Sequence, residues 1–287
     1  MTRTRADFRY FDRLRVRWVE VDMQKIVFNG HYLMYFDTAV AGYWRALALP
    51  YTDTMNLLQG DLYVRKATVE YHGSAQYDDL LQVGMRCGRV GNTSVVFEGG
   101  VFRGDQLLVG GELVYVFADP ATMTPKPVPP DLRDVLTGFE AGKPMVDVRV
   151  GTWDVLGREA QAIRTTVFID EQKIPADMEW DAADAECLHA VAYNRFGLPL
   201  ATGRLLEHVP GTAKIGRMAV LAPMRGSGVG RAVLDALMAA ARQRGEREVL
   251  LHAQTSAELF YQRAGFTARG PRFDEAGIGH VEMLRAL

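Results

Sequence analysis

The first 118 residues combine one strongly apolar helical segment with several strand-like segments. Residues 31–47 leave almost no polar face, which predicts a long helix enclosed by other structure. A short strand is expected at 14–19 before this helix, and residues 62–72, 80–90, 93–103 and 106–118 read as strands after it. Gly91-Asn92 and Gly104-Asp105 suit tight hairpin turns, so we expect an antiparallel sheet that curls over one buried helix.

The second half mixes helices and strands more evenly. Asp154 can cap a helix that follows a strand at 146–153, and a hairpin is expected about Gly197. A glycine-rich loop then separates a strand from a helix, which predicts a mixed α/β domain. The expected strands are 146–153, 187–194, 200–207, 213–221, 249–253 and two closing strands, and the later helices are 229–244 and 256–263.

A proline-rich segment lies between the halves. Residues 119–144 contain six prolines around one short helical pattern at 131–138, which is typical of a tether. A chain of 287 residues usually forms more than one core. We therefore expect two domains, 1–142 and 143–287.

Composition excludes several classes of protein. The net charge is -2, from 33 basic and 35 acidic residues, so nothing favours binding to nucleic acid or to an anionic membrane. The only cysteines, Cys87 and Cys187, lie in apolar stretches without a metal-ligand set, which predicts buried free thiols and no metal site. No apolar run could span a bilayer and no signal-peptide pattern is present, so a cytoplasmic protein is expected.

A first candidate site lies at the start of the apolar helix. Asp22 falls in the loop before it, and the helix start near Asn29 and Gly30 offers unpaired peptide N–H groups. Such groups can hold a thioester carbonyl oxygen as it gains negative charge, and Asp22 can then attack the carbonyl carbon or activate a water. Asp22 is also an ordinary turn residue.

The surrounding residues resemble a known family. Trp18, Asp22 and Val27-Phe28 before the aromatic helix, followed by 65–71 (RKATVEY) and 77–79 (YDD), resemble the YbgC-like branch of the 4-hydroxybenzoyl-CoA thioesterase family over about residues 8–136. The resemblance implies a hot-dog fold of class α+β, in which an antiparallel sheet surrounds a central helix. It also implies a homodimer or larger assembly, acyl-CoA substrates and a catalytic role for Asp22.

The chain differs from its relatives at one position of the helix start, and it has two groups of basic residues that are candidates for binding phosphate. Relatives often carry histidine at the position of Asn29, and His31 is more simply a structural or solvent-facing residue. Lys66 and an N-terminal arm of arginines could hold the phosphates of CoA, although such residues are usually solvated. The arm consists of Arg3, Arg5, Arg9 and Arg13.

A second candidate site is the loop 225–230 (RGSGVG) between a strand and a helix. Its peptide N–H groups can converge on a phosphate. The loop lacks the Gly-Lys-Ser/Thr of nucleotide triphosphatases, and Gln254 stands where a dinucleotide fold needs an acidic residue. A phosphate-binding loop of another class is therefore expected.

This half resembles the ElaA-like branch of the GNAT acetyltransferases from about residue 146 to the end. The spacing Arg225-x-x-Gly228-x-Gly230 matches the pyrophosphate motif, and 254–266 (QTSAELFYQRAGF) matches the second CoA motif, with glutamine where asparagine is commoner. The resemblance implies an α/β domain with a mixed sheet. It further implies that Tyr261 protonates the departing thiolate and that the following residues bind CoA: Met218, Ala219, Val220, Arg225, Gly226, Ser227, Gly228, Val229, Gly230 and Gln254.

The base on the acceptor side is left open. An attacking amine must lose a proton to a side chain or a water. His280 and Glu171 belong to branch-specific motifs and are preferred. The other candidates are Glu179, Asp181 and His189.

Together these patterns predict a bifunctional protein: an acyl-CoA thioester hydrolase joined to an acetyl-CoA-dependent N-acetyltransferase that acts on an unknown amine. One alternative is a thioesterase whose second half binds CoA without catalysis and regulates the first. Another is a hydratase on the first fold, but hydratases of this kind use Asp-x-x-x-x-His, and Val27 stands five residues after Asp22.

Overall fold

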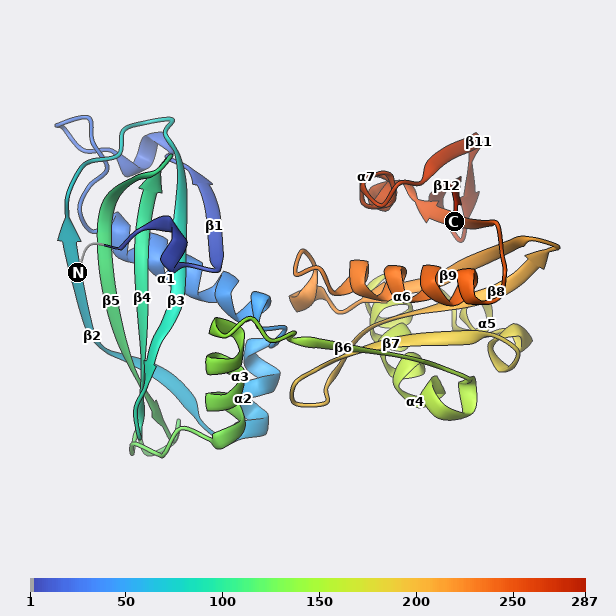
Figure 1. Ribbon diagram of the computed structural model, residues 1–287, viewed down its shortest axis with the longest axis horizontal. Coiled ribbons are helices and arrows are strands. Elements are labelled where there is room, and N and C mark those ends of the chain that lie inside the picture. Colours follow the sequence, from blue (N-terminus) through green and yellow to red (C-terminus); the bar gives the residue numbers. More distant parts are fainter. Residues whose placement is uncertain (1–2) are drawn as a thin grey trace. The chain divides into compact units, whose positions relative to one another are not determined.

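The computed structural model describes residues 3–287, which divide into two compact units. Unit 1 ends at Met145, and unit 2 runs from Val146 to Leu287. Each unit has its own sheet (Figure 1).

Unit 1 is a five-stranded antiparallel sheet wrapped on a long helix (Figure 1). The strand order is β1-β3-β4-β5-β2, so β1 and β2 form the edges. The elements are β1 (Tyr10–Arg15), α1 (His31–Ala46), α2 (Tyr51–Leu58), β2 (Asp61–Tyr71), β3 (Leu80–Val90), β4 (Ser94–Arg103), β5 (Gln106–Ala118) and α3 (Pro130–Glu140).

The sheet approaches α1 closely because two strands carry glycine under the helix. A Cβ atom added at Gly99 or at Gly111 would lie 2.5 Å from the ring of Phe36. Phe36 itself is completely buried. The opposite side of α1 is open, since Leu33 and Met34 are 40% and 42% exposed, so the expectation of a fully enclosed helix is wrong.

Two local expectations in unit 1 are also wrong. The strand expected at 14–19 is β1, which ends at Arg15, and residues Trp18–Glu20 form a 3-10 helix instead. The reason is electrostatic and local: the Glu20 carboxylate accepts hydrogen bonds from the Arg17 peptide N–H and guanidinium, which closes the turn. The helix α2 was not predicted.

The proline-rich segment is not a free tether, because its helix packs on unit 1. Leu132 and Leu136 of α3 are completely buried, and Arg133 donates hydrogen bonds to the carbonyls of Val90 and Gly91 at 2.8 and 2.7 Å. The proline content of the segment does not show that its short helix has an apolar face, nor that this face packs on unit 1.

Unit 2 is a seven-stranded mixed sheet with helices on it (Figure 1). The strand order is β11-β12-β10-β9-β8-β7-β6, and β9 with β10 is the parallel pair. The elements are β6 (Val146–Gly151), α4 (Trp153–Arg164), a π-helix (Thr165–Glu171), α5 (Ala176–Glu179), β7 (Leu188–Asn194), β8 (Pro199–Val209), β9 (Thr212–Val220), α6 (Val229–Gln243), β10 (Glu248–Gln254), α7 (Glu258–Arg263), β11 (Thr267–Glu275) and β12 (Ile278–Ala286).

Helices α4 and α6 cover opposite faces of this sheet. The apolar side of α4 packs with Ala219 of β9, which pairs with Thr202 of β8, whereas the neighbouring Gly203 faces Leu237 of α6. Consecutive strand residues point to opposite faces. The N-cap of α4 is Thr152, and the expected cap Asp154 lies inside the helix, so β6 ends two residues earlier than predicted.

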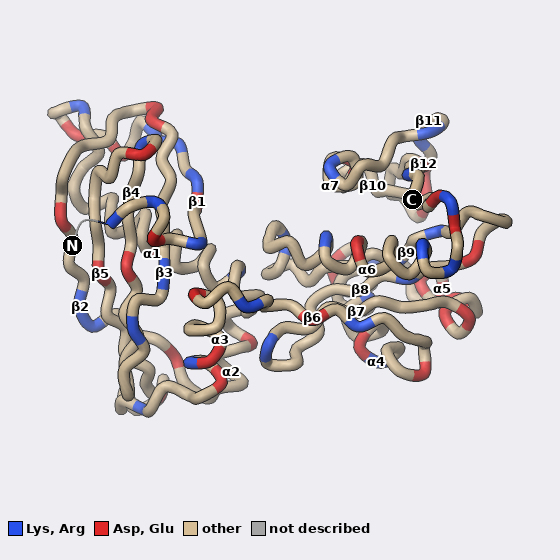
Figure 2. Tube along the Cα trace, viewed as in Figure 1, with Lys and Arg blue, Asp and Glu red and all other residues tan. Residues whose placement is uncertain are grey.

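The predicted fold class is confirmed: an α+β hot-dog unit followed by an α/β unit with a mixed sheet. Cys87 and Cys187 are free and buried, as expected. Basic and acidic residues are interspersed along the trace of both units (Figure 2). Across residues 3–287, no helix combines the length and the apolar character needed to cross a membrane.

Candidate functional site

In unit 1, Asp22 begins a tight turn at the tip of a short hairpin. Its Oδ1 accepts a hydrogen bond from the Gln24 peptide N–H at 2.8 Å, and its own N–H donates to the carbonyl of Ile26 at 2.9 Å. Lys25 has a φ of 61°, in the left-handed region. Oδ2 of Asp22 has no partner within the part of the chain that the structure describes, so one carboxylate oxygen is available.

The base of the hairpin is fixed to α1 by a buried carboxylate. Glu20 is 1% exposed and accepts hydrogen bonds from Arg17 and, at 2.8 Å, from the Tyr35 hydroxyl of α1. Burial acts to raise the pKa of Glu20, but the hydrogen bonds from Arg17 and Tyr35 outweigh it and hold the pKa below its ordinary value. The sequence analysis did not identify Glu20, although a carboxylate inside an apolar run was a visible signal.

The start of α1 lies beyond this base. The Phe28 N–H donates to the Glu20 carbonyl at 2.9 Å, and Asn29 and Gly30 follow before His31. No acceptor among residues 3–287 meets the peptide N–H of Asn29 or Gly30. Asp22 therefore lies opposite Ile26 and is separated from Asn29 by about three strand residues, roughly 10 Å along the hairpin. Among the described residues, no hydrogen bond joins Asp22 to Asn29 or Gly30 at the helix start.

Lys66 lies in a groove of about 230 Å³ on unit 1 that also holds carboxylates. Its Nζ is 4.0 Å from Glu112, and Glu70 and Glu98 line the same groove. Arg3 pairs with Glu98. These residues do not form the unpaired basic surface that the phosphates of CoA would require.

In unit 2, β9 and β10 separate after their first few residues. They pair only from Glu248 opposite Thr212 to Leu251 opposite Ile215. Beyond this point β9 contains a bulge, since Thr202 of β8 lies opposite Ala219 but Arg204 lies opposite Gly216. The predicted CoA-binding residues Met218–Val220 therefore pair with β8 on one side only.

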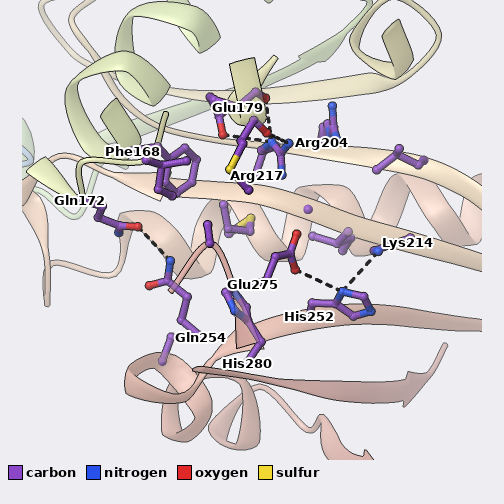
Figure 3. Close-up of a pocket in the computed structure, with 18 of the residues that line it drawn as sticks. Phe168, Gln172, Glu179, Arg204, Lys214, Arg217, His252, Gln254, Glu275 and His280 are labelled. Carbon is purple, nitrogen blue, oxygen red and sulfur yellow. Dashed lines mark hydrogen bonds and ion pairs between the residues drawn. The ribbon is translucent and has the colours of Figure 1, made fainter. Parts of the chain in front are cut away.

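A cavity of about 240 Å³ lies where these strands separate. Gln172 accepts a hydrogen bond from the Gln254 side chain at 2.9 Å at one end, and Lys214 and His252 lie at the other end (Figure 3). Its wall includes Phe168, Met178, Met218 and Tyr261. The structure thus brings four predicted site residues to one cavity, namely Met218, Gln254, Tyr261 and His280, together with Glu179 from the open base candidates.

Tyr261 is 7% exposed and comes from α7. Its ring contacts Phe260 and Phe266 edge-on, and burial raises the pKa of its phenol. A phenol with a raised pKa keeps its proton at neutral pH, as a general acid must.

His280 faces the cavity from β12 (Figure 3). Its ring stacks on that of Phe273. Its Nδ1 lies 2.8 Å from the carbonyl of Ile278. A carbonyl only accepts, so Nδ1 carries the proton and Nε2 of the neutral ring holds the lone pair.

The glycine loop lies at the start of α6. Gly226 and Gly228 have φ values of 80° and 90°, and an added Cβ atom at either position would meet nothing within 4 Å. Ser227 is turned inward, with its hydroxyl donating to the Met224 carbonyl at 2.6 Å. The peptide N–H groups of Gly226 and Gly228 have no acceptor in the described part of the chain, so the loop fits a phosphate group.

Glu171 and Arg225 bind each other. The Arg225 guanidinium donates to both carboxylate oxygens of Glu171 at 2.7 Å, and this lowers the pKa of Glu171. Glu171 does not line the cavity. Glu171 is thus paired with an arginine of the glycine loop and lies outside the residues that line the cavity.

The remaining base candidates are also engaged. Glu179 accepts from Arg164 at 2.5 Å and Asp181 from Arg204 at 2.7 Å, and both arginines are buried. His189 is 1% exposed and bonded to the Asp184 carbonyl. The sequence analysis missed Lys214, His252 and Glu275, which all line the cavity; His252 was visible as the titratable residue inside the predicted strand 249–253.

Comparison with known proteins matches each unit to a different family. Residues 167–287 match the description "Acetyltransferase (GNAT) domain", and residues 24–109 match "Thioesterase superfamily". Asp22 lies two residues before the second match.

Individual relatives and solved structures each match about half of this chain. The uncharacterized protein YyaT of Bacillus subtilis is 36% identical over 132 residues, which are 45% of this chain and 88% of that protein. The uncharacterized N-acetyltransferase YjcF of the same organism is 35% identical over 129 residues, which are 45% of this chain and 91% of that protein. A crystal structure of DHNA-CoA thioesterase from Staphylococcus aureus is 20% identical, with a TM-score of 0.42, and covers 46% of this chain and 90% of that one. The chain therefore joins a thioesterase-superfamily hot-dog domain to a second domain that belongs to the GNAT acetyltransferase family.

Proposed function

We propose that unit 2 transfers the acetyl group of acetyl-CoA to an amine in the cavity between β9 and β10. The observation that carries this proposal is the separation of the two strands beside the glycine loop, with Tyr261 in the wall. The loop amides at 226–230 hold the diphosphate and the free side of Met218–Val220 pairs with the pantetheine arm. Gln254 lines the same cavity.

The transfer needs one acid and one base. The amine nitrogen attacks the thioester carbonyl carbon, the C–S bond breaks, and the sulfur takes the phenol proton of Tyr261. His280 Nε2 takes the proton that the amine loses, because Nδ1 is held by the Ile278 carbonyl. Glu171 instead orients Arg225 at the loop.

Calorimetric titration with acetyl-CoA, combined with an assay of thiol release over a panel of amines, tests this proposal. We expect binding and amine-dependent release of CoA. Binding without turnover over the whole panel would favour the alternative, a non-catalytic CoA-binding domain that regulates unit 1. Absence of binding would contradict both.

For unit 1 we propose hydrolysis of an acyl-CoA thioester, in which Asp22 is the nucleophile or the base that activates water. The free Oδ2 of Asp22 supports this assignment. We expect Asp22→Asn to reduce free thiol release from acyl-CoA by about 10²–10⁴-fold, since the amide cannot attack or accept the proton. Asp53→Asn, on the exposed side of α2, is the matched control and should retain activity.

The same variants separate hydrolysis from hydration. A hydratase would convert an unsaturated acyl-CoA without releasing thiol. Thiol release that is unchanged in Asp22→Asn would contradict the assignment of this residue.

Unit 1 is further proposed to self-associate through the edge strand β2. Its side chains are exposed on both faces over most of its length, and Val64 and Tyr71 are 54% and 53% exposed. An open edge with apolar side chains is a site of strand pairing. Sedimentation analysis should give at least a dimer, and Val64→Lys should shift it toward the monomer.

A further inference from the structure

The cavity of unit 2 contains a buried nitrogen that lacks a partner. Arg204 is 6% exposed, and its two terminal nitrogens donate to Asp181 and Asp184 at 2.7 Å. Its Nε, by contrast, has no acceptor among the described residues. A buried donor left unsatisfied destabilises the folded state. Arg204 lines the cavity, so an oxygen of a bound molecule would remove that destabilisation.

The space beside this nitrogen is open because the facing residue is glycine. Gly216 lies opposite Arg204 in the β8–β9 pairing, and an added Cβ at Gly216 would lie 4.0 Å from Arg204 Nε. The other near atom, a methyl of Leu206, would be 3.9 Å away. A ligand oxygen can therefore lie over Gly216 within reach of the buried N–H.

A second cation faces the same space. Lys214 is two residues before Gly216 on β9, so both point to the same face of the sheet. Its Nζ lies 3.5 Å from His252 Nδ1, and no carboxylate of the described chain lies within 4.0 Å of it (Figure 3). Burial and the nearby Arg204 and Arg217 outweigh the carboxylates around it and lower the pKa of Lys214, so the lysine lacks the anion that would stabilise its charge.

A negative charge lies at the same end of the cavity. Glu275 is 3.7 Å from His252 and its side chain is 51% exposed (Figure 3). Unlike Glu179, which is held by Arg164 and Arg217, Glu275 is bound by no arginine in the described residues. The cavity thus presents two donor nitrogens that bind no carboxylate, Lys214 Nζ and Arg204 Nε, and one accessible carboxylate, Glu275.

We propose that the acetyl acceptor is a small amine that also carries a carboxylate, in other words an amino acid, and that Lys214 and Arg204 determine this specificity. The carboxylate accepts hydrogen bonds from Lys214 Nζ and Arg204 Nε over Gly216, and the ammonium group faces Glu275 before it is deprotonated. The volume of about 240 Å³ is below that of pockets for drug-sized ligands, which limits the acceptor to a small molecule. This inference rests on the acetyl transfer proposed above.

The test compares amino acids with the amines that lack only the carboxylate. Glycine and methylamine, β-alanine and ethylamine, and lysine and 1,5-diaminopentane are titrated into the full-length protein with CoA present, and binding is followed by NMR. At least one amino acid should bind 10-fold or more tightly than its partner. Equal binding within every pair, or no binding of any amino acid, would overturn the inference.

Variants at two positions locate the effect. Lys214→Met should remove the preference for the amino acid, whereas Lys214→Arg should keep part of it. Gly216→Ala places a methyl group where the carboxylate is expected and should weaken binding by 10-fold or more. It should not disturb the backbone, since the nearest atom to that methyl, on Leu206, would be 3.9 Å away. Preference that survives both Lys214→Met and Gly216→Ala would contradict the proposal.

The controls separate this inference from the proposed activity. Lys173→Met changes an exposed lysine between two cavity residues and should have no effect. Titration of acetyl-CoA and an assay of transfer are run on the same samples. Amino-acid binding that depends on Lys214 without transfer would contradict the transferase but support the carboxylate site.

Discussion

Both units present unpaired peptide N–H groups at a helix start, but only in unit 2 does the strand before that start line a cavity with candidate acid and base residues. At α1, Asn29 and Gly30 are separated from Asp22 by the length of a short hairpin. At α6, the glycine loop is separated only by a 3-10 helix (Ala222–Met224) from β9, the strand whose bulge lies beside the cavity. A helix start supplies attraction for negative charge. The neighbouring strands determine whether an acid and a base also lie close to the bound group.

The largest expected effect tests the acid in the completed cavity. Tyr261→Phe should lower acetyl transfer by about 10²–10⁴-fold, since the departing thiolate loses its proton donor. Acetyl-CoA binding should change little. Stopped-flow measurement of CoA release gives the rate, and Tyr193→Phe, a buried tyrosine outside the cavity, is the control. A rate within twofold of wild type would show that another group is the acid.

The next largest effect concerns the buried network of ion pairs beside the cavity of unit 2. Among the described residues, unit 1 has no buried network of this size. Arg164 is 1% exposed and binds Glu179 at 2.5 Å and Asp184 at 2.7 Å. Arg164→Met leaves two buried carboxylates without this partner and should lower the free energy of unfolding of unit 2 by about 3–5 kcal/mol. Hydrogen exchange of β7 amides measures the change.

The control for this network is Arg149→Met. Arg149 pairs with Asp147 at the surface, and its removal should stay within about 0.5 kcal/mol. Equal losses in the two variants would mean that burial does not distinguish these ion pairs.

A smaller effect separates backbone strain from phosphate binding at the α6 start. Gly228 has a φ of 90°, and Gly228→Ala should cost about 1–2 kcal/mol because side chains disfavour this conformation. If the loop binds the diphosphate of CoA, the affinity for acetyl-CoA should fall by about 10-fold, measured by calorimetry. Gly197→Ala adds a comparable strain in the β7–β8 turn, at a φ of 74°, and should leave the affinity unchanged.

The smallest effect is a pH dependence of stability in unit 2. Burial lowers the pKa of His189, so the unfolded chain takes up a proton at a higher pH than the folded one does. Stability should therefore fall as the pH drops below about 6.5 toward the folded pKa. Urea unfolding monitored by β7 exchange at pH 7.5, 6.5 and 5.5 should show this slope. It should be reduced in His189→Gln and unchanged in His208→Gln, which alters an exposed residue.

Sequence patterns predicted both folds because each element carries a strong local signal. The apolar run of α1, the alternation of β3 and the glycine loop all depend on neighbouring residues in the chain. The missed features depend on partners far away. Met34 is exposed because only one sheet covers α1, and Glu171 pairs with Arg225, which lies 54 residues later in the chain.

The same limit applies to the cavity. Gln254, Tyr261 and His280 were predicted because their motifs are short, and the structure brings them together. Lys214, Arg204 and Glu275 come from three different strands whose alignment no local pattern encodes. Only the strand register shows that the side chain of Arg204 faces Gly216.

The bulge in β9 also determines how much this strand can change in length. Arg217 and Met218 oppose the single residue Gly203, so Gly216 and Ala219, an odd number of positions apart, both face α4. Losing one residue here would restore strict alternation and leave the later side chains on their present faces, but it would remove the bend that a bulge gives to its strand. A deletion between Gly216 and Ala219 should therefore keep β9 paired with β8 while it narrows the cavity beside β10.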